Sequence, residues 1–289
     1  MAGVKMSIQW FPGHMAKARR MIEKELAMVD VVIELVDARI PVASKNPLLE
    51  EIIGKKRPHL IVMTKADLAD PGRTAHWLRT YHDRGYGAIA LDLTRGGKQA
   101  TKALTEAIYD LSHDKRAKFM GKGAQKVRVH AMIIGIPNVG KSTLINSVVG
   151  RSVADTGNKP GVTKGKQWLR LSEDIELLDT PGILWPKFEN EDLGYQLAIT
   201  GAISDDVFVP EEAAFRLVRH LQAYYPQLLT ARYGLSSDVL DREDPYGLMQ
   251  AIGRRRGALI SGGRVDDRKT ATLLLKDYRN GAIGRISLE

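Results

Sequence analysis

One eight-residue stretch constrains the fold of this chain more than any other feature. Residues 135–142 have the sequence Gly-Ile-Pro-Asn-Val-Gly-Lys-Ser, which matches the phosphate-binding pattern G-x-x-x-x-G-K-[ST]. An apolar run lies before it at 129–134, and a helical pattern lies after it at 141–149. A strand, a glycine-rich loop and a helix N-terminus in this order present backbone N–H groups to a phosphate, which an ordinary glycine-rich turn does not. The stretch therefore predicts an α/β fold built around a phosphate-binding loop.

Strand and helix patterns alternate on both sides of this loop. The expected strands lie at 31–36, 60–63, 88–91, 129–134 and 175–178, and the expected helices at 15–29, 73–82, 98–112 and 141–149. This alternation predicts a parallel sheet with helical connections. Residues 115–128 contain six basic residues, no acidic residue and two glycines, so we expect an exposed connector there.

The pattern changes beyond residue 204. Helical segments are expected near 211–224, 226–233, 246–256 and 265–278. We therefore expect two domains, an α/β domain over 1–204 and a small all-α domain over 205–289.

Further polar residues follow the expected strand 175–178. Asp179 stands at its end, where a carboxylate can hold Mg²⁺ together with the Ser142 hydroxyl, and Gly182 can present its N–H to a γ-phosphate. Thr163, in a glycine-rich segment between the two motifs, is expected to complete the Mg²⁺ shell. An ordinary Pro-Gly turn or loop threonine has the same local sequence, so these assignments depend on the phosphate-binding loop.

A second motif indicates which base is bound. Thr64-Lys65-Ala66-Asp67 resembles the guanine-binding motif N-K-x-D, in which the aspartate accepts hydrogen bonds from the guanine N1–H and amine while the lysine stem covers the ring. Adenine cannot donate that pair of bonds, so Asp67 favours GTP over ATP. The motif therefore argues against an ATP-dependent kinase. Taken alone, such a tetrapeptide is as often a surface turn. Thr64 replaces the usual asparagine and removes an amide donor, so we expect a weaker tie to the phosphate-binding loop. The predicted nucleotide contacts are Thr64, Lys65, Ala66, Asp67, Asp92, Leu93, Asn138, Val139, Gly140, Lys141, Ser142, Thr143 and Gly182.

The order of the motifs indicates a circular permutation. In ordinary Ras-like GTPases the base-binding motif follows the phosphate-binding loop, whereas here it precedes that loop. Moving the chain termini, and joining the old ends through the connector 115–128, leaves the strands in the same spatial order. The expected fold class is therefore α/β, a P-loop GTPase sheet with circular permutation followed by a small all-α C-terminal domain.

Composition narrows the function classes further. The chain has no cysteine, which excludes disulfides, cysteine-ligated zinc and thiol nucleophiles. Its 43 basic and 34 acidic residues give a net charge of +9, which favours a polyanion such as RNA as a partner. No apolar run is long enough to span a bilayer and residues 1–9 lack the apolar core of a secretory signal, so we expect a cytoplasmic protein without a membrane partner.

Taken together, the motifs resemble those of one family. The resemblance covers nearly the whole chain and includes the two motifs above together with Trp10-Phe-Pro-Gly-His-Met-Ala-Lys17, Asp37-Ala-Arg-Ile-Pro41, Pro160-Gly-Val-Thr-Lys-Gly165 and Asp179-Thr-Pro-Gly-Ile-Leu-Trp-Pro-Lys-Phe188. These segments are similar to those of the circularly permuted GTPases of the ribosome biogenesis GTPase A family. The resemblance implies a GTPase of late large-subunit assembly in bacteria, whose partners are the precursor of the large ribosomal subunit and its ribosomal RNA, and whose hydrolysis the subunit stimulates. It also implies ribosome association, and we expect a monomer off the ribosome.

The same resemblance supplies catalytic candidates. Ile183 stands where many small GTPases have the glutamine that orients the attacking water, and an apolar side chain cannot do this. The family implies His14 for that role, whereas the sequence alone makes it a histidine at a helix start. Asn138 resembles the asparagine of K⁺-activated GTPases, whose side-chain oxygen helps hold K⁺ beside the β- and γ-phosphates, although by itself it is a turn asparagine. Mg²⁺ and K⁺ are thus the expected cofactors, and GTP is the expected substrate.

The C-terminal helices carry cations that the resemblance assigns to RNA. The predicted phosphate contacts are Arg254, Arg255, Arg256, Arg268, Lys269 and Lys276. A solvated helix face would have a similar composition, because acidic residues lie among these cations, and the first helix and the connector are alternative RNA surfaces.

A GTP-dependent RNA-binding scaffold with negligible hydrolysis is the alternative function, because the usual glutamine is missing.

Overall fold

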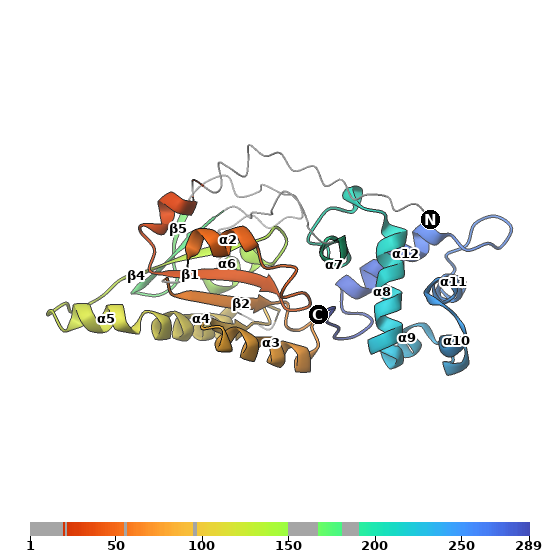
Figure 1. Ribbon diagram of the computed structural model, residues 1–289, viewed down its shortest axis with the longest axis horizontal. Coiled ribbons are helices and arrows are strands. Elements are labelled where there is room, and N and C mark those ends of the chain that lie inside the picture. The colour runs from red at the N-terminus through yellow and green to blue at the C-terminus, as the bar shows by residue number, and fades with distance from the viewer. Residues whose placement is uncertain (1–19, 21, 55–56, 95–96, 150–166, 181–190) are drawn as a thin grey trace. The chain divides into compact units, whose positions relative to one another are not determined.

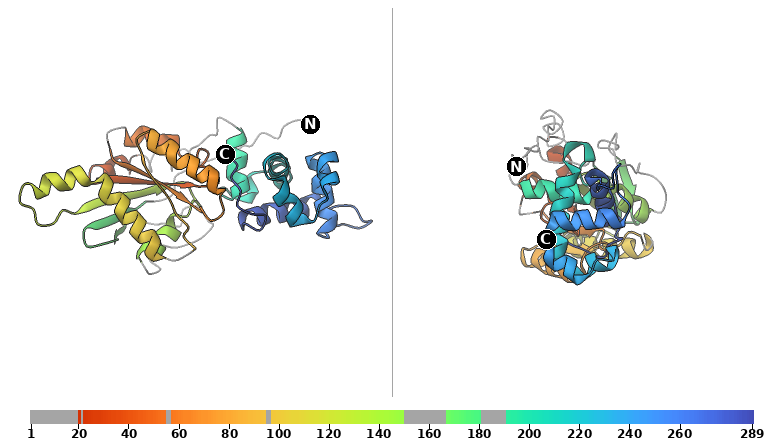
Figure 2. Two further views of the ribbon diagram at one scale, coloured as in Figure 1. Left: turned by 90° about the horizontal axis from the view of Figure 1, so that it is seen from below. Right: turned by 90° about the vertical axis from the view of Figure 1, so that its right-hand side faces the viewer.

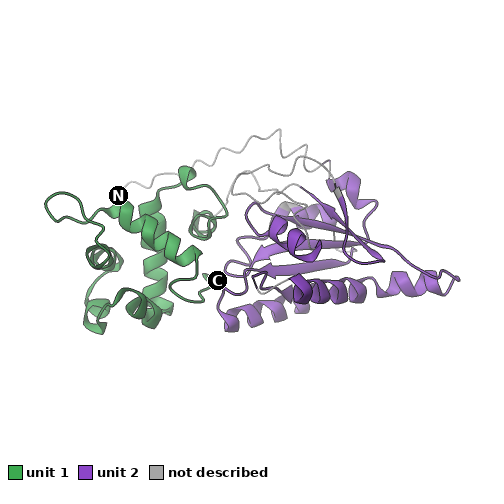
Figure 3. Ribbon diagram, turned by 180° about the vertical axis from the view of Figure 1, so that it is seen from behind, with its two compact units in different colours: residues 1–8, 188–288 green, residues 9–187, 289 purple. Residues whose placement is uncertain are grey.

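The structure, a computed structural model, describes residues 20, 22–54, 57–94, 97–149, 167–180 and 191–289 of the chain. The chain divides into two compact units, which have different colours in Figure 3. We call residues 9–187 with Glu289 the sheet unit, and residues 1–8 with 188–288 the helical unit. Each unit has a buried hydrophobic core of its own.

A six-stranded sheet forms the centre of the sheet unit (Figure 1). Its strands are β1 (Val31–Asp37), β2 (His59–Thr64), β3 (Gly87–Ala90), β4 (Val129–Gly135), β5 (Gln167–Arg170) and β6 (Ile175–Asp179), in the spatial order β3-β2-β1-β4-β6-β5. All neighbouring strands are parallel except β5 and β6, which are antiparallel. The predicted α/β class is confirmed, and β5 is a strand that the sequence patterns did not predict.

The connections change direction in the middle of this sheet. The chain leaves β1 through helix α2 (Pro47–Ile53) toward β2, whereas it leaves the neighbouring strand β4 through helix α6 (Lys141–Val149) toward β6 on the other side. Open α/β sheets bind their ligands beyond the carboxyl ends of the two strands where the strand order reverses in this way. The loops after β1 and β4 therefore stand at the expected ligand site.

Helices cover both faces of the sheet. Helical residues 22–26 and α2 share an apolar cluster with Val32 of β1, and α3 (Pro71–Asp83) contributes Tyr81 to a cluster with Val36. The two valines are four residues apart in a strand, so both clusters lie on one face. Helix α4 (Gly97–Leu111) contacts α6, and right-handed crossovers place this pair on the opposite face.

The predicted connector is helical in its first half. Helix α5 (His113–Met120) follows α4, and none of its side chains is buried. It extends past the sheet, as Figures 1 and 2 show. The exposure predicted for this segment is confirmed, but the helix continues to Gly121 because the residues before that glycine are good helix formers.

The helical unit contains six α-helices among the described residues. They are α7 (Glu191–Thr200), α8 (Pro210–Tyr224), α9 (Pro226–Tyr233), α10 (Ser237–Arg242), α11 (Pro245–Arg255) and α12 (Asp267–Arg279), of which α7 and α10 were not predicted. The unit begins at Phe188, before the boundary of 204/205 that the sequence suggests, because α7 packs on α8 and α12. The Arg279 guanidinium of α12 also donates to the carbonyls of Ala198 and Ile199 in α7. No helix in the described part of the chain is long and apolar enough to cross a membrane.

Candidate nucleotide-binding site

The predicted phosphate-binding loop lies between β4 and α6, at the carboxyl edge of the sheet. Asn138 and Gly140 have φ angles of +59° and +101°, which L side chains rarely adopt and which bend the loop back on itself. Helix α6 begins at Lys141, and its first-turn N–H groups have no partner within the helix. This geometry suits an anion such as a phosphate. Ser142 is half-buried and Thr143 is exposed at the same end of the helix.

Lys141 is held inside this loop. Its side chain is only 8% exposed, and Nζ lies 2.5 Å from Oδ1 of Asp179, which ends β6 and is itself buried. The pair satisfies two charges that burial would otherwise penalise heavily. The pair also holds Lys141, the predicted phosphate contact, next to Asp179, the predicted metal ligand.

The oxygen donors at this position fit Mg²⁺. One carboxylate of Asp179 and one hydroxyl of Ser142 are hard oxygen ligands, and Mg²⁺ usually takes few protein ligands and completes its shell with phosphate oxygens and water. Among the described residues, no group of three or more His, Cys, Asp or Glu side chains could hold a metal by itself. Ser142 and Asp179 would thus supply only part of the Mg²⁺ shell.

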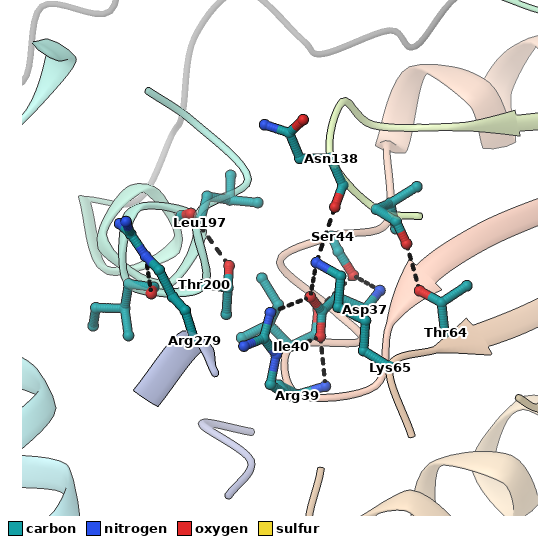
Figure 4. A network of polar contacts seen from close by, with 12 residues as sticks. Asp37, Arg39, Ile40, Ser44, Thr64, Lys65, Asn138, Leu197, Thr200 and Arg279 are labelled. Atoms are coloured by element: carbon teal, nitrogen blue, oxygen red, sulfur yellow. Dashed lines mark hydrogen bonds and ion pairs between the residues drawn. The ribbon is translucent and has the colours of Figure 1, made fainter. Parts of the chain in front are cut away.

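The base-binding motif follows β2, next to the phosphate-binding loop (Figure 4). Lys65 has a φ angle of +56°, and its Nζ donates to the Asn138 carbonyl at 2.9 Å. Burial lowers the pKa of the Lys65 ammonium, an effect that the Asp37 carboxylate opposes. Ala66 and Asp67 are half-buried in the same turn. The structure thus brings residues from both sides of the permutation together, as the sequence predicts.

The Thr64 hydroxyl connects the two motifs. Its side chain is fully buried, and its hydroxyl lies 2.5 Å from the Val139 carbonyl and 3.1 Å from the Val36 carbonyl. A threonine hydroxyl at this distance donates to the loop directly. That this tie is weaker than the one an asparagine would make stays a prediction.

We expect Thr64→Val to loosen the phosphate-binding loop. The substitution keeps the shape but leaves the buried Val139 carbonyl without this donor, which costs about 1–3 kcal/mol. GDP affinity, followed by fluorescence titration, should fall roughly tenfold. Thr74→Val is the matched control, since Thr74 is also buried and donates only to the Asp70 carbonyl in its own helix. Equal affinities for the two variants would contradict the proposed tie.

The loop after β3 lies against the base-binding motif and the phosphate-binding loop. Ala66 donates to the Leu91 carbonyl at 3.3 Å, which joins this loop to the base-binding motif. Asp92 accepts from both the N–H and the hydroxyl of Thr94, so its carboxylate stabilises its own turn. Leu93 lies against Gly140, where a Cβ would meet its Cδ1 at 3.9 Å. Both predicted residues are therefore beside the site, and Leu93 contacts the phosphate-binding loop.

A buried ion cluster follows β1, and the sequence patterns gave its residues no role. The Arg39 side chain is 1% exposed, and it donates to both oxygens of Asp37, through Nε at 2.9 Å and Nη2 at 2.7 Å. Lys65 Nζ lies 3.0 Å from Oδ2 of the same carboxylate (Figure 4). Burial alone would raise the pKa of Asp37, but the two cations outweigh burial and hold it well below the ordinary 3.8.

This cluster predicts a pH dependence of stability. A carboxyl with a lowered pKa stabilises the fold fully above its unfolded pKa, near 3.8, and the stabilisation declines as the pH falls below that value. The difference in unfolding free energy between the wild type and Asp37→Asn, measured with urea, should be constant between about pH 7 and about pH 5 and shrink below about pH 4. A difference that does not change in acid would contradict the account.

Three predicted site residues lie outside the described residues. They are His14, Thr163 and Gly182. Their assignments remain predictions from the sequence.

The predicted RNA contacts are exposed in the helical unit. Arg254, Arg255 and Arg256 stand at the C-terminal end of α11, and Arg268, Lys269 and Lys276 on α12. Cations at a helix C-terminus also stabilise the helix dipole, so α11 has a structural reason for part of this charge. Arg256 in addition lies over the Tyr233 ring at 5.2 Å and donates to the Arg232 carbonyl.

The chain is similar to known GTPases. Residues 130–221 match the family model described as 50S ribosome-binding GTPase. The ribosome biogenesis GTPase A of Priestia megaterium is 47% identical over 285 residues, which cover 98% of this chain and 97% of the relative. The ribosome biogenesis GTPase A of Thermotoga maritima is 29% identical over 282 residues, which cover 98% and 94% of the two chains.

Solved structures show a similar fold. The GNP-bound YlqF from T. maritima has a TM-score of 0.61 at 25% identity, covering 94% of this chain and 97% of that chain. A GDP-bound YlqF structure has a TM-score of 0.62 at 24% identity, covering 93% and 98%.

Proposed function

Because this chain belongs to the ribosome biogenesis GTPase A family, we propose that it acts in late assembly of the large ribosomal subunit and that the subunit stimulates its turnover. The chain is a GTP-hydrolysing enzyme, as its family and its matched GTPase domain indicate. One observation carries the proposal most strongly. Thr64 and Lys65 donate to the carbonyls of Val139 and Asn138, so the segment that resembles a guanine-binding motif lies directly beside the phosphate-binding loop.

In this proposal, each residue of the nucleotide site has a specific role. Asp67 accepts hydrogen bonds from the guanine edge, and the Lys65 stem covers the ring face. The loop amides and Lys141 bind the β- and γ-phosphates. Ser142 and Asp179, with Thr163, would hold Mg²⁺, which would supply positive charge near the phosphates. The Gly182 N–H binds the γ-phosphate.

Catalysis requires a group that orients the attacking water. Ile183 cannot do so, and His14 takes this role in our proposal, as a neutral imidazole brought to the γ-phosphate when the ribosome orders its segment. Asn138 would hold K⁺ through its side-chain oxygen. Such a cation stabilises the charge that develops in the transition state.

The helical unit supplies the RNA contact in this proposal. Its six exposed cations on α11 and α12 suit phosphate oxygens, and each contact would release counterions. Binding to precursor particles should therefore weaken with salt. GTP would favour the binding-competent state, and hydrolysis would permit release from a cytoplasmic precursor particle.

We expect large-subunit precursor particles to raise the rate of phosphate release, more in K⁺ than in Na⁺. The assay is phosphate release under single-turnover conditions with and without particles. His14→Ala should lose the stimulated rate, by about 10²–10⁴-fold for a water-orienting group, while retaining GDP affinity. Lys102→Ala, at an exposed lysine of α4 that pairs with Glu106, is the control.

The alternative function is a GTP-dependent RNA-binding scaffold. It predicts particle binding that depends on GTP but no stimulation of phosphate release by particles in either salt. That result, with the wild type shown to bind GTP, would favour the scaffold over the proposed enzyme.

A further inference from the structure

Asp37 and Arg39, at the end of β1 and in the loop after it, form an ion pair that the proposed function leaves without a role. Asp37 is 2% exposed and accepts four hydrogen bonds from cationic or backbone donors: three from Arg39 and one from Lys65. A fully buried arginine is costly unless its charge is matched, so the cluster is a specific arrangement and not a surface ion pair. It lies at the switch point of the sheet, beside the phosphate-binding loop.

Asp37 is itself held from two sides. The planar Arg39 guanidinium binds both carboxylate oxygens, which fixes the plane of the carboxylate. The Ser44 hydroxyl accepts from the Asp37 N–H at 2.9 Å and donates to the Ile40 carbonyl at 2.6 Å, which fixes the backbone. The carboxylate therefore has one orientation, in which Oδ2 faces Lys65 (Figure 4).

Lys65 joins this cluster to the phosphate-binding loop. Its ammonium lies 3.0 Å from the Asp37 carboxylate and 2.9 Å from the Asn138 carbonyl. A lysine side chain has four flexible torsions, and holding it in one conformation costs entropy. Asp37 makes that conformation favourable before any nucleotide arrives.

We infer that Asp37 is a positioning residue for the nucleotide site, which fixes the Lys65 ammonium against the Asn138 carbonyl, and that Arg39 and Ser44 keep Asp37 in place. The inference rests on the proposed pocket, in which the Lys65 stem covers the guanine ring. A pre-ordered lysine binds the base without a further entropy cost, so the cluster raises affinity for guanine nucleotides. The effect should be similar for GDP and GTP, because the two nucleotides share the guanine ring that the Lys65 stem covers in the proposed site.

A double-mutant cycle tests this inference in the full chain. Asp37→Asn should weaken GDP binding roughly 10–100-fold, since it removes a charged hydrogen-bond acceptor. In the Lys65→Met background the same substitution should weaken binding no further, because its effect passes through Lys65. Equal losses in both backgrounds would overturn the inference and indicate a general structural role.

Glu34→Gln is the matched control. Glu34 is also fully buried in β1 and supports the other end of the same loop, where it accepts from the Asn46 N–H at 3.2 Å. Its carboxylate faces His59 at 3.1 Å instead of Lys65. We expect this variant to lose stability and to keep its GDP affinity.

A second measurement covers the case in which Asp37→Asn does not fold. Ser44→Ala removes only the hydroxyl that holds the Asp37 backbone. The Lys65 ammonium should give an observable NMR signal in the nucleotide-free wild type, because its protons exchange slowly when hydrogen-bonded. The signal should be lost in Ser44→Ala and retained in Glu34→Gln, and the opposite pattern would contradict the positioning role. This NMR measurement needs no nucleotide. A wild type that fails to bind GDP would therefore contradict the proposed function, while the NMR result would still test the role of Asp37.

Discussion

Lys141→Met should reduce GTP hydrolysis by at least about 10²–10³-fold, because the substitution removes the cation of the phosphate-binding loop. The side chain is buried, and its partner Asp179 is an anion that cannot replace the lost charge. The measurement is the single-turnover rate of phosphate release. GDP affinity should also fall, because the β-phosphate loses the same contact.

The stability of this variant separates folding from function. Removing Lys141 leaves Asp179 buried without its partner, which costs about 3–5 kcal/mol for a buried pair. Circular dichroism must therefore confirm a folded protein at the assay temperature. Lys126→Met is the control, because Lys126 is 70% exposed and should change neither activity nor stability measurably. A folded Lys141→Met protein with wild-type hydrolysis would refute the phosphate-site assignment.

Asp67→Asn should change the base that the protein prefers. An asparagine offers an N–H donor where the carboxylate accepted, so the guanine amine would meet a donor and GTP binding should weaken by about 10³-fold or more. Xanthosine triphosphate has a carbonyl at that position and should bind the variant better than GTP. Competition against a fluorescent guanine nucleotide measures both affinities.

Asp70→Asn provides the matched control for this exchange. Asp70 is three residues further along and caps helix α3 by accepting from the Arg73 N–H at 3.0 Å. Asparagine caps helices about as well, so neither stability nor base preference should change. A base preference that shifts equally in both variants, or in neither, would remove Asp67 from the base site.

The sheet and the phosphate site could be predicted because their signals are local. Buried parallel strands such as β1 and β2 are short apolar runs, and the loop at 135–142 needs glycine and lysine at fixed spacings. The family resemblance then supplied roles for residues such as His14, which the physical pattern alone leaves open.

The structural contacts of Thr64 and Asp37 could not be predicted, because they form between distant parts of the chain. Thr64 and Val139 are separated by 75 positions, and whether a threonine hydroxyl reaches that carbonyl depends on the distance between two loops. Arg39 is a similar case, since nothing local shows that a charged side chain will be buried until a carboxylate and a sheet edge enclose it.

The packing partners of α7 could not be predicted for a related reason. Helix α7 belongs to the helical unit through side chains that pack on α8 and α12, far along the sequence. Its buried residues include Tyr195, Leu197 and Ile199. Periodicity identifies an amphipathic helix more readily than it identifies the core that the helix joins.

Binding calorimetry of GDP and ADP to the wild-type chain tests the central claim most directly, namely that one guanine-nucleotide pocket is built from both sides of the permutation. If Asp67 and the phosphate-binding loop act on one ligand, GDP should bind at a single site and at least about 100-fold more tightly than ADP. Equal affinities would mean that the phosphate-binding loop works without the base-binding motif, and the account would be wrong.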